Sequence, residues 1–209
     1  MSLRSRYIAL AGLFAAMLVC TLGFDRVFAL WLSEHASALV PIARSFTDAI
    51  TWLVLPWLPK WVHPLVLIVV GGALTVFTGR AWLRPFAITA VVLFATRVSV
   101  TWLKGVFERV RPFEYLADPK LADFFVAGHD SFPSGHTAVY MGLLIPPALM
   151  FARWRWPLIV VASLLAFARV VEGDHYLGDV IGSAFIALAF AVIVTSLASR
   201  FPSPGISKP

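Results

Sequence analysis

The sequence predicts an all-α protein that crosses a membrane six times, and three observations lead to this fold class. Of its 209 residues, 60% are hydrophobic and only 13% are charged. Because a soluble domain carries roughly 25% charged residues, this chain lacks the charge needed to cover a surface that faces water. Its apolar residues form long runs without strand-like alternation. Backbone in lipid must satisfy its own hydrogen bonds, so these runs predict helices.

Six runs approach the roughly 20 apolar residues that a helix needs to cross a bilayer. They are residues 7–24, 61–79, 85–103, 132–152, 156–171 and 180–199. The first run follows Arg4 and Arg6, as the apolar part of a signal peptide would. No convincing cleavage site comes after it, and Asp25 and Arg26 follow directly. We therefore expect this run to remain as the first transmembrane helix.

The other five runs differ in the ionisable residues that they contain. The second holds only His63, the third holds Arg97 and the fourth holds His136. The fifth is shorter and has Arg169 near its end, and the sixth is uncharged. All five are predicted transmembrane helices. Ionisable groups at membrane depth are costly, so each one is a candidate for function.

An apolar stretch at residues 49–59 lies between the first and second runs. At 11 residues it is too short to cross the membrane. We expect it to lie at the interface or to re-enter the membrane, with Trp52, Trp57 and Trp61 as interfacial aromatic residues.

The charges are divided between two sets of connecting segments. All 11 acidic residues fall at 25–60, 104–131 and 172–179. The opposite set has no acidic residue and contains Arg4, Arg6, Arg80, Arg84, Arg153, Arg155, Arg200 and Lys208. Short basic loops stay in the cytoplasm, so both termini are predicted to be cytoplasmic and the acidic loops to face outward. The net charge of +6 then reflects membrane topology, which disfavours a nucleic-acid partner.

The first polar cluster is Lys104 and Arg111, followed by Pro112. Seven positions separate the two cations, so on one helix they would share a face, and Pro112 would end that helix. Two cations on one face at a headgroup interface suit an anion. The alternative is that both side chains extend to the lipid headgroups.

The second cluster is Pro133–His136, which opens the fourth run. Ser134 and Gly135 would lie at a helix N-terminus, where backbone N–H groups bind anions. His136 adds a group that exchanges a proton near neutral pH. The alternatives are a plain N-cap for Ser134 and a histidine hydrogen-bonded to a nearby carbonyl.

The third cluster is Arg169, His175 and Asp179. On a helix that starts the sixth run, His175 and Asp179 would share a face at positions i and i+4. The carboxylate would accept a hydrogen bond from one imidazole nitrogen and so orient the lone pair of the other nitrogen. Arg169 offers a planar donor pair for phosphate. The alternative is a buried Arg–Asp ion pair with a histidine beside it.

The predicted topology brings all three clusters to the same side of the membrane at the same depth. Cations, a helix N-terminus and two histidines then meet at one place. Transfer of a dianionic phosphoryl group requires these elements: charge neutralisation, a nucleophile and a general acid.

In this order, K-x6-R-P, P-S-G-H and R-x5-H-x3-D resemble the motifs of the type-2 phosphatidic acid phosphatase family, membrane lipid phosphatases related to vanadium haloperoxidases. The motifs cover residues 104–179, and the six runs extend the resemblance over nearly the whole chain. We therefore expect residues 1–209 to form a single membrane-embedded domain. One departure is Ala168, where the family usually has serine. This change removes one possible hydroxyl contact to phosphate.

The resemblance implies a metal-independent reaction without a cofactor. It implies that His175 attacks phosphorus, that Asp179 orients His175, and that His136 protonates the leaving oxygen and then activates water. The residues implied to bind phosphate are Lys104, Arg111, Ser134, Gly135 and Arg169.

Two residues outside the motifs are also candidates. Arg97 lies seven positions before Lys104, on the same face of a helix. We expect it to support the site through a structural pairing, and the alternative is contact with a second phosphate or headgroup of the substrate. His129, with Asp130, precedes the second motif and is expected in a solvated loop or at the entrance of the site.

The resemblance implies a multi-pass lipid phosphatase of a bacterial inner membrane, surrounded by membrane lipids, and the charge pattern predicts that its site faces outward. Undecaprenyl pyrophosphate, phosphatidylglycerol phosphate, phosphatidic acid and lipid A phosphates all fit such a site. Three alternatives are a lipid phosphotransferase, a lipid or anion transporter, and a metallohydrolase. The metal ligands of the last would be His129, Asp130, His136, Asp174 and His175, although their spacing matches no common zinc pattern.

Overall fold

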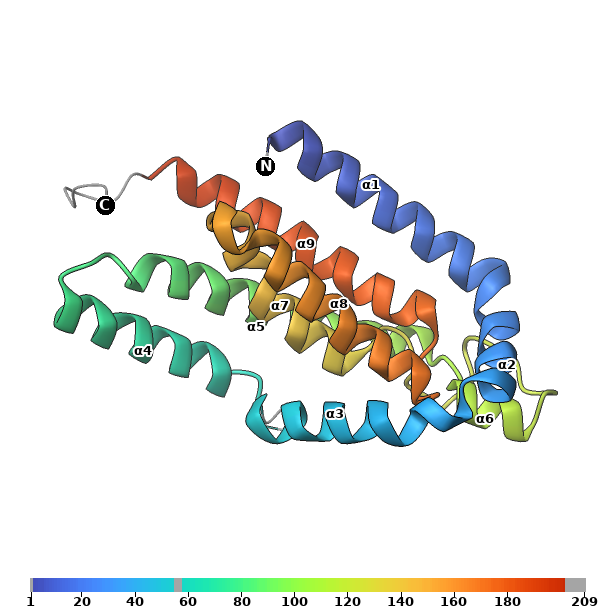
Figure 1. Ribbon diagram of the computed structural model, residues 1–209. Helices are drawn as coiled ribbons and strands as arrows, with labels where there is room; N and C mark the ends of the chain where they lie inside the picture. Colours follow the sequence, from blue (N-terminus) through green and yellow to red (C-terminus); the bar gives the residue numbers. More distant parts are fainter. Residues whose placement is uncertain (1, 55–57, 202–209) are drawn as a thin grey trace.

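The computed structural model describes residues 2–54 and 58–201, and of residues 53 and 54 only the backbone. All regular structure in these ranges is helical, which confirms the all-α class (Figure 1). The α-helices are α1 (Leu3–Val19), α2 (Asp25–His35), α3 (Val40–Val54), α4 (Val62–Thr78), α5 (Leu83–Phe107), α6 (Pro112–Ala117), α7 (Gly135–Met150), α8 (Arg155–Val171) and α9 (Leu177–Ser199).

Four helical stretches are long and apolar enough to cross a membrane: Leu3–His35, Leu83–Ala117, Ala152–Val171 and Leu177–Ser199. They coincide with the first, third, fifth and sixth predicted runs. The second and fourth runs form the shorter helices α4, with 17 residues, and α7, with 16. Large apolar side chains such as Leu22, Val76 and Phe77 are exposed on the outside. Together these features indicate a multi-pass membrane protein.

The first stretch contains one irregular turn. A five-residue π-helix, Cys20–Phe24, joins α1 to α2, and the chain changes direction there (Figure 1). Such turns are rare and occur often at functional sites. Asp25, the first residue of α2, is buried and accepts a 2.9 Å hydrogen bond from the backbone N–H of Gly178 at the start of α9. The start of α2 is thereby fastened to the start of α9.

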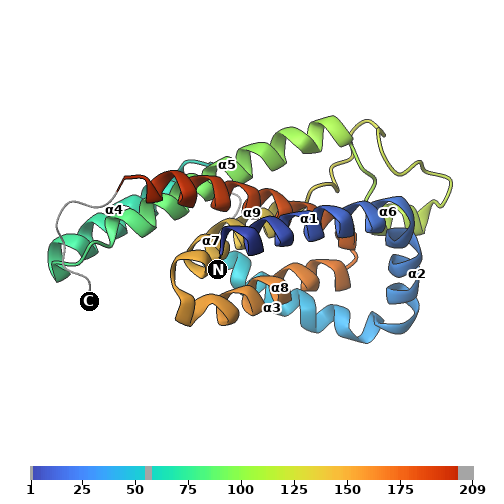
Figure 2. The ribbon, with the colours of Figure 1, turned by 90° about the horizontal axis from the view of Figure 1, so that it is seen from above.

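Helices α5, α7 and α9 form the centre of the bundle. Helix α7 packs against α5, α8 and α9, and α9 lies between α1 and α5 (Figures 1 and 2). Glycine allows two of these close contacts. A Cβ on Gly142 of α7 would lie 3.1 Å from Cα of Leu93 in α5. A Cβ on Gly178 would lie 2.6 Å from Cγ2 of Thr21, so only glycine lets the first helix approach α9 this closely.

The two ends of the bundle differ. The start of α1, the end of α9 and the turn between α4 and α5 lie at one end, and α2 and α6 lie at the other (Figure 1). Arg6 donates a 3.0 Å hydrogen bond to Thr195 Oγ1, and Arg84 donates to the carbonyl of Ala198. The predicted basic segments near the termini are therefore neighbours in space.

The stretch at residues 49–59 is helical through Val54 of α3, which packs on α8. Trp57 lies outside the described residues. Trp52 and Trp61 are both exposed. Location at the membrane interface remains a prediction.

Lys104 and Arg111 do not share one helix, so this prediction is wrong. Helix α5 ends at Phe107, because Glu108 takes the left-handed conformation with φ of 39°. Arg111 is extended and precedes Pro112, which starts α6 instead of ending α5. Proline restricts the residue before it to extended conformations and is favoured at the first helical position.

The prediction that His175 lies on the last helix is also wrong. Helix α9 begins at Leu177, and Tyr176 is its N-cap with an extended backbone. The side chain of Asp179, in the first turn, accepts a 2.9 Å hydrogen bond from the Tyr176 N–H. This cap turns the chain so that His175 still meets Asp179 without helical geometry.

Candidate active site

A cavity of about 390 Å³ lies beside the C-terminal half of α5 and the start of α7. Its apolar wall includes Val100, Ala138 and Val139. Its polar wall unites residues from all three predicted clusters: Lys104, Arg111, Gly135, His136 and His175, together with Asp130. The cavity is therefore the place where the sequence motifs meet.

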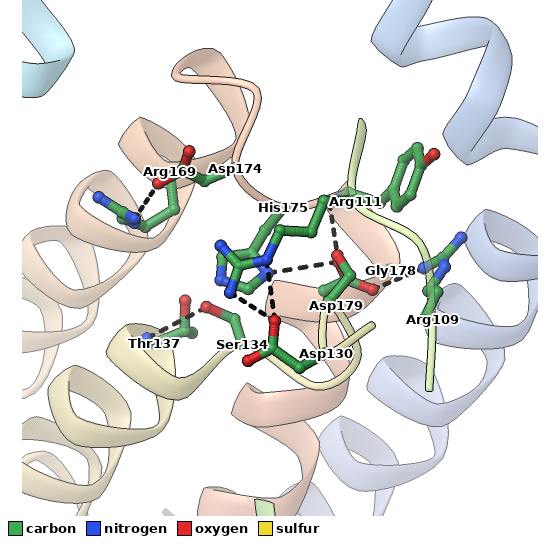
Figure 3. Close-up of polar contacts among 12 residues, drawn as sticks. Arg109, Arg111, Asp130, Ser134, Thr137, Arg169, Asp174, His175, Gly178 and Asp179 are labelled. Carbon is green, nitrogen blue, oxygen red and sulfur yellow. Dashed lines mark hydrogen bonds and ion pairs between the residues drawn. The ribbon is translucent and has the colours of Figure 1, made fainter. Parts of the chain in front are cut away.

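His175 opens onto this cavity but is only 2% exposed. Its Nδ1 lies 3.5 Å from Oδ2 of Asp179 (Figure 3). Burial lowers the pKa of His175 below its ordinary value, although the carboxylate of Asp179 acts in the opposite direction. The imidazole is consequently neutral near pH 7. A neutral ring whose Nδ1 faces a carboxylate can present Nε2 as a nucleophile, and such contacts are often long before substrate binds.

Asp179 is fully buried and accepts three hydrogen bonds. Nη1 of Arg109 donates to Oδ1 over 2.6 Å, while Oγ of Ser131 donates to Oδ2 over 2.6 Å. The Tyr176 N–H also donates to Oδ2. A buried carboxylate is stable only when it is paired and hydrogen-bonded. The three hydrogen bonds together fix its orientation toward His175.

Arg109 is the main residue that sequence reasoning missed. Its side chain is 0% exposed and forms ion pairs with Asp25 at 2.9 Å, Asp123 at 3.0 Å and Asp179 at 2.6 Å. Its guanidinium lies 4.2 Å from the centre of the Tyr176 ring, a favourable cation–π position. The one available signal was Asp25, a carboxylate at the end of an apolar run that requires a positive partner.

Lys104 and Arg111 converge on one carboxylate. Nε and Nη2 of Arg111 donate to Oδ1 of Asp130 over 3.0 and 2.8 Å (Figure 3). Nζ of Lys104 lies 3.3 Å from Oδ2 of the same carboxylate. Burial raises the pKa of Asp130, but the hydrogen bond from Arg111 and the charge of Lys104 outweigh it and lower the pKa. The two cations thus hold an anionic oxygen pair at the cavity wall.

The second motif forms the predicted helix N-terminus. Ser134 is the buried N-cap of α7, and its Oγ accepts a hydrogen bond of 3.4 Å from the Thr137 N–H. The N-cap alternative for Ser134 is therefore confirmed. Gly135 and His136 line the cavity, and a Cβ on Gly135 would lie 3.7 Å from Cε of Lys104. The open N-terminus of α7 thus lies beside the Lys104 side chain.

Arg169 is buried and pairs with carboxylates of its own turn. Its Nη1 donates to Glu172 over 2.5 Å, and its Nη2 donates to Asp174. Glu172 also accepts from the hydroxyl of Thr47 in α3. The ion-pair alternative for Arg169 is present, and the residue is not among those that line the cavity. Its contact with phosphate remains a prediction.

The two additional candidates lie in different places. Arg97 lines the cavity, with Nη1 2.9 Å from Nδ1 of His63 and Nη2 donating to the carbonyl of Leu58 over 3.0 Å. His129 lies away from the cavity wall, with Nδ1 3.0 Å from Oε2 of Glu114. Within residues 2–54 and 58–201, no three histidine, cysteine or acidic side chains gather as a metal site.

Known proteins resemble this chain in sequence and in fold. The PAP2 superfamily model matches residues 82–202. A lipid A 1-phosphatase of Rhizobium etli is 30% identical over 57% of this chain and 52% of its own length. An undecaprenyl-diphosphatase of Sulfolobus acidocaldarius is 28% identical over 70% of each chain. The chain thus spans about half the length of the first relative.

A solved structure shares the fold. The transmembrane PAP2-type phosphatidylglycerolphosphate phosphatase of Bacillus subtilis has a TM-score of 0.64 at 20% identity, covering 94% of this chain and 98% of its own. The match of the family model extends over more than half of the sequence and includes all three motifs. The chain therefore belongs to the PAP2 superfamily.

Proposed function

We propose that this protein is an integral-membrane phosphatase that removes a terminal phosphate from a lipid phosphate or diphosphate through a phosphohistidine. One observation carries the proposal. A buried neutral imidazole, His175, faces the same cavity as Lys104 and Arg111, and Asp179 holds its Nδ1 side. A nucleophile beside fixed cations suits attack on a phosphate dianion.

The proposed reaction has two steps. Nε2 of His175 attacks phosphorus, the bond from phosphorus to the lipid oxygen breaks, and His136 donates a proton to that oxygen. His136 then takes a proton from water, whose oxygen attacks phosphorus and releases phosphate from His175. Lys104, Arg111 and the N-terminus of α7 neutralise the phosphate oxygens in both steps, so the reaction needs no metal ion. Arg169 and Ser134 are proposed as further phosphate ligands.

The substrate class follows from the surroundings of the site. The cavity has an apolar wall and lies in a helix bundle whose outer surface is apolar, so the hydrocarbon part of a substrate can stay in lipid. Relatives named for undecaprenyl diphosphate and lipid A support lipid diphosphates and phosphorylated lipids as substrates. The charge pattern supports six membrane crossings, cytoplasmic termini and a site on the outer face of a bacterial inner membrane.

The proposal is tested by phosphate release from purified protein in lipid vesicles. The substrates are a polyprenyl diphosphate, phosphatidylglycerol phosphate, phosphatidic acid and lipid A, each without any acceptor and with a strong chelator present. We expect phosphate from at least one lipid and none with His175→Ala. His35→Ala, a change at an exposed histidine of α2, is the matched control. A lipid that loses its phosphate only when an acceptor is added, with the phosphate recovered on that acceptor and not as inorganic phosphate, would instead identify a phosphotransferase.

A further inference from the structure

The charge on the cavity wall extends well beyond the proposed reaction centre. Two of the lining cations, Lys104 and Arg111, surround Asp130 at that centre. Two more, Lys60 and Arg97, line the same cavity. In the described residues, Asp130 is the one carboxylate on the wall against these four cations. The cavity as a whole is therefore suited to more negative charge than one phosphate carries.

One face of α5 runs along the cavity. Arg97, Val100, Thr101 and Lys104 all line it, and their spacing of three, four and seven positions places them on one side of a helix. Seven residues of helix rise about 10 Å. Arg97 therefore lies about two turns deeper in the span than Lys104, on the side from which a lipid chain would extend into the bilayer.

The Arg97 side chain is fixed by its neighbours. His63 Nδ1 and the Leu58 carbonyl accept hydrogen bonds of 2.9 and 3.0 Å from its two terminal nitrogens. Both contacts come from the chain just before and at the start of α4, and the residue is 9% exposed. A guanidinium oriented in this way is preorganised for an anion. An arginine at membrane depth is costly to keep unless it has a function.

We propose that Arg97, with Lys60, binds a second phosphoryl group of the substrate, on the lipid side of the phosphate that is removed. This subsite selects lipids that carry two phosphoryl groups over lipids that carry one, and it rests on the proposed function. The second group is either the inner phosphate of a diphosphate or a phosphodiester one short spacer away. Both present anionic oxygens that the positive charge of the Arg97 guanidinium attracts.

The test compares matched substrates in vesicles. One pair is a polyprenyl diphosphate and the polyprenyl monophosphate of equal length. The other is phosphatidylglycerol phosphate and phosphatidic acid with equal acyl chains. We expect Arg97→Gln to lower kcat/KM about 10- to 100-fold for one or both lipids with two phosphoryl groups, as for the loss of a charged hydrogen-bond donor. The monophosphates should change less than about threefold. The pair that responds identifies the source of the second group.

Arg84→Gln is the matched control, because Arg84 lies in the first turn of the same helix, far from the cavity residues near its C-terminal end. Equal losses on all four lipids, or no loss on either lipid with two phosphoryl groups, would overturn the subsite. Arg97→Lys keeps the charge and provides a folded variant if Arg97→Gln does not fold. It should show the same selective loss to a smaller extent.

A binding measurement separates this inference from the proposed function. His175→Ala protein is titrated with inorganic phosphate and with methylenediphosphonate. We expect the diphosphonate to bind more tightly, and the Arg97→Gln change to remove that preference. This outcome would support the subsite even if the wild-type protein releases no phosphate from any lipid. An unchanged preference would refute a subsite for the inner phosphate of a diphosphate, even if the protein proves to be a phosphatase, and titration with glycerophosphoglycerol phosphate tests the phosphodiester form in the same way.

Discussion

Nη1 of Arg109 donates a 2.6 Å hydrogen bond to Oδ1 of Asp179, and neither side chain is exposed to solvent. The other carboxylate oxygen of Asp179 faces His175. Arg109 is itself fixed by Asp25 and Asp123. The orientation of the proposed nucleophile therefore depends on an arginine that does not line the cavity.

Two replacements of Arg109 should distinguish the effect of its positive charge from the effect of its planar donor geometry. Arg109→Gln leaves three buried or half-buried carboxylates without their cation, which should lower the free energy of unfolding by about 3–5 kcal/mol. Arg109→Lys keeps the charge but loses the planar donor pair, so we expect kcat to fall about tenfold with little change in KM. Thermal unfolding in detergent and steady-state kinetics measure the two effects. Arg26→Lys, at a half-exposed arginine, is the control. Wild-type stability and kcat in Arg109→Gln would contradict this role.

The pH dependence should identify His175 as the group that must be neutral. Burial lowers the pKa of His175 below its ordinary value of about 6.5, so the acid limb of kcat/KM should lie below about pH 6.5. The carboxylate of Asp179 acts to raise this pKa. Asp179→Asn should therefore move the acid limb to lower pH while kcat falls by a factor on the order of 10² to 10⁴.

The measurement is a pH profile of kcat/KM for both proteins on one lipid, so that ionisation of the substrate cancels in the comparison. Asp48→Asn, at an exposed position of α3, should leave the profile unchanged. A shift of the acid limb to higher pH in Asp179→Asn would be inconsistent with the assigned contact.

Asp130 should compete with phosphate for Lys104 and Arg111. Its carboxylate accepts hydrogen bonds from Arg111 and lies 3.3 Å from Nζ of Lys104. Asp130→Asn should therefore lower the inhibition constant of inorganic phosphate by about three- to tenfold, a modest factor because Asp130 is half exposed. Since the pKa of Asp130 is lowered, the effect should not vary across the neutral pH range. Asp118→Asn, which removes an exposed charge nearby in sequence, is the control. Weaker phosphate inhibition would show that Asp130 supports the cations.

We expect the hydrogen bond of Thr47 to stabilise the packing of α3 against the bundle. Its buried hydroxyl donates to Glu172, which in turn accepts from Arg169. Thr47→Val removes this donor with little change in shape, so we expect a loss of about 1–3 kcal/mol in the free energy of unfolding. Thr78→Val, at an exposed threonine that bonds within its own helix, should have little effect. Chemical unfolding in mixed micelles compares the two, and equal stabilities would exclude the attachment.

The sequence was sufficient to predict structural features that depend on residues close to one another along the chain. Runs of apolar residues predicted the helices, and the Ser134 N-cap lies where the motif placed it. Two local predictions failed because helix periodicity was extended across helix ends. Glu108 turns the chain before Arg111, and the extended Tyr176 leaves His175 outside α9.

The sequence could not predict pairings between distant segments. Arg109 and Asp179 are 70 positions apart, and Asp25 and Gly178 are 153 apart. Such contacts depend on how closely the helices approach one another. The spacing from Lys104 and the following Pro112 pointed to Arg111, whereas no local signal pointed to Arg109, which is fully buried while Arg111 borders the cavity.

The hydrogen bond between Asp25 and the start of α9 should limit how far this protein can be shortened from its N-terminus. The region shared with the PAP2 superfamily begins at residue 82, so a chain cut there would keep every motif residue but lose Asp25. Arg109 would then lose one of its carboxylate partners, and Gly178 would lose its close contact with Thr21. We therefore expect that the region matched by the family model does not fold on its own, and that exchanging the first helix between relatives requires exchanging the residues that contact it.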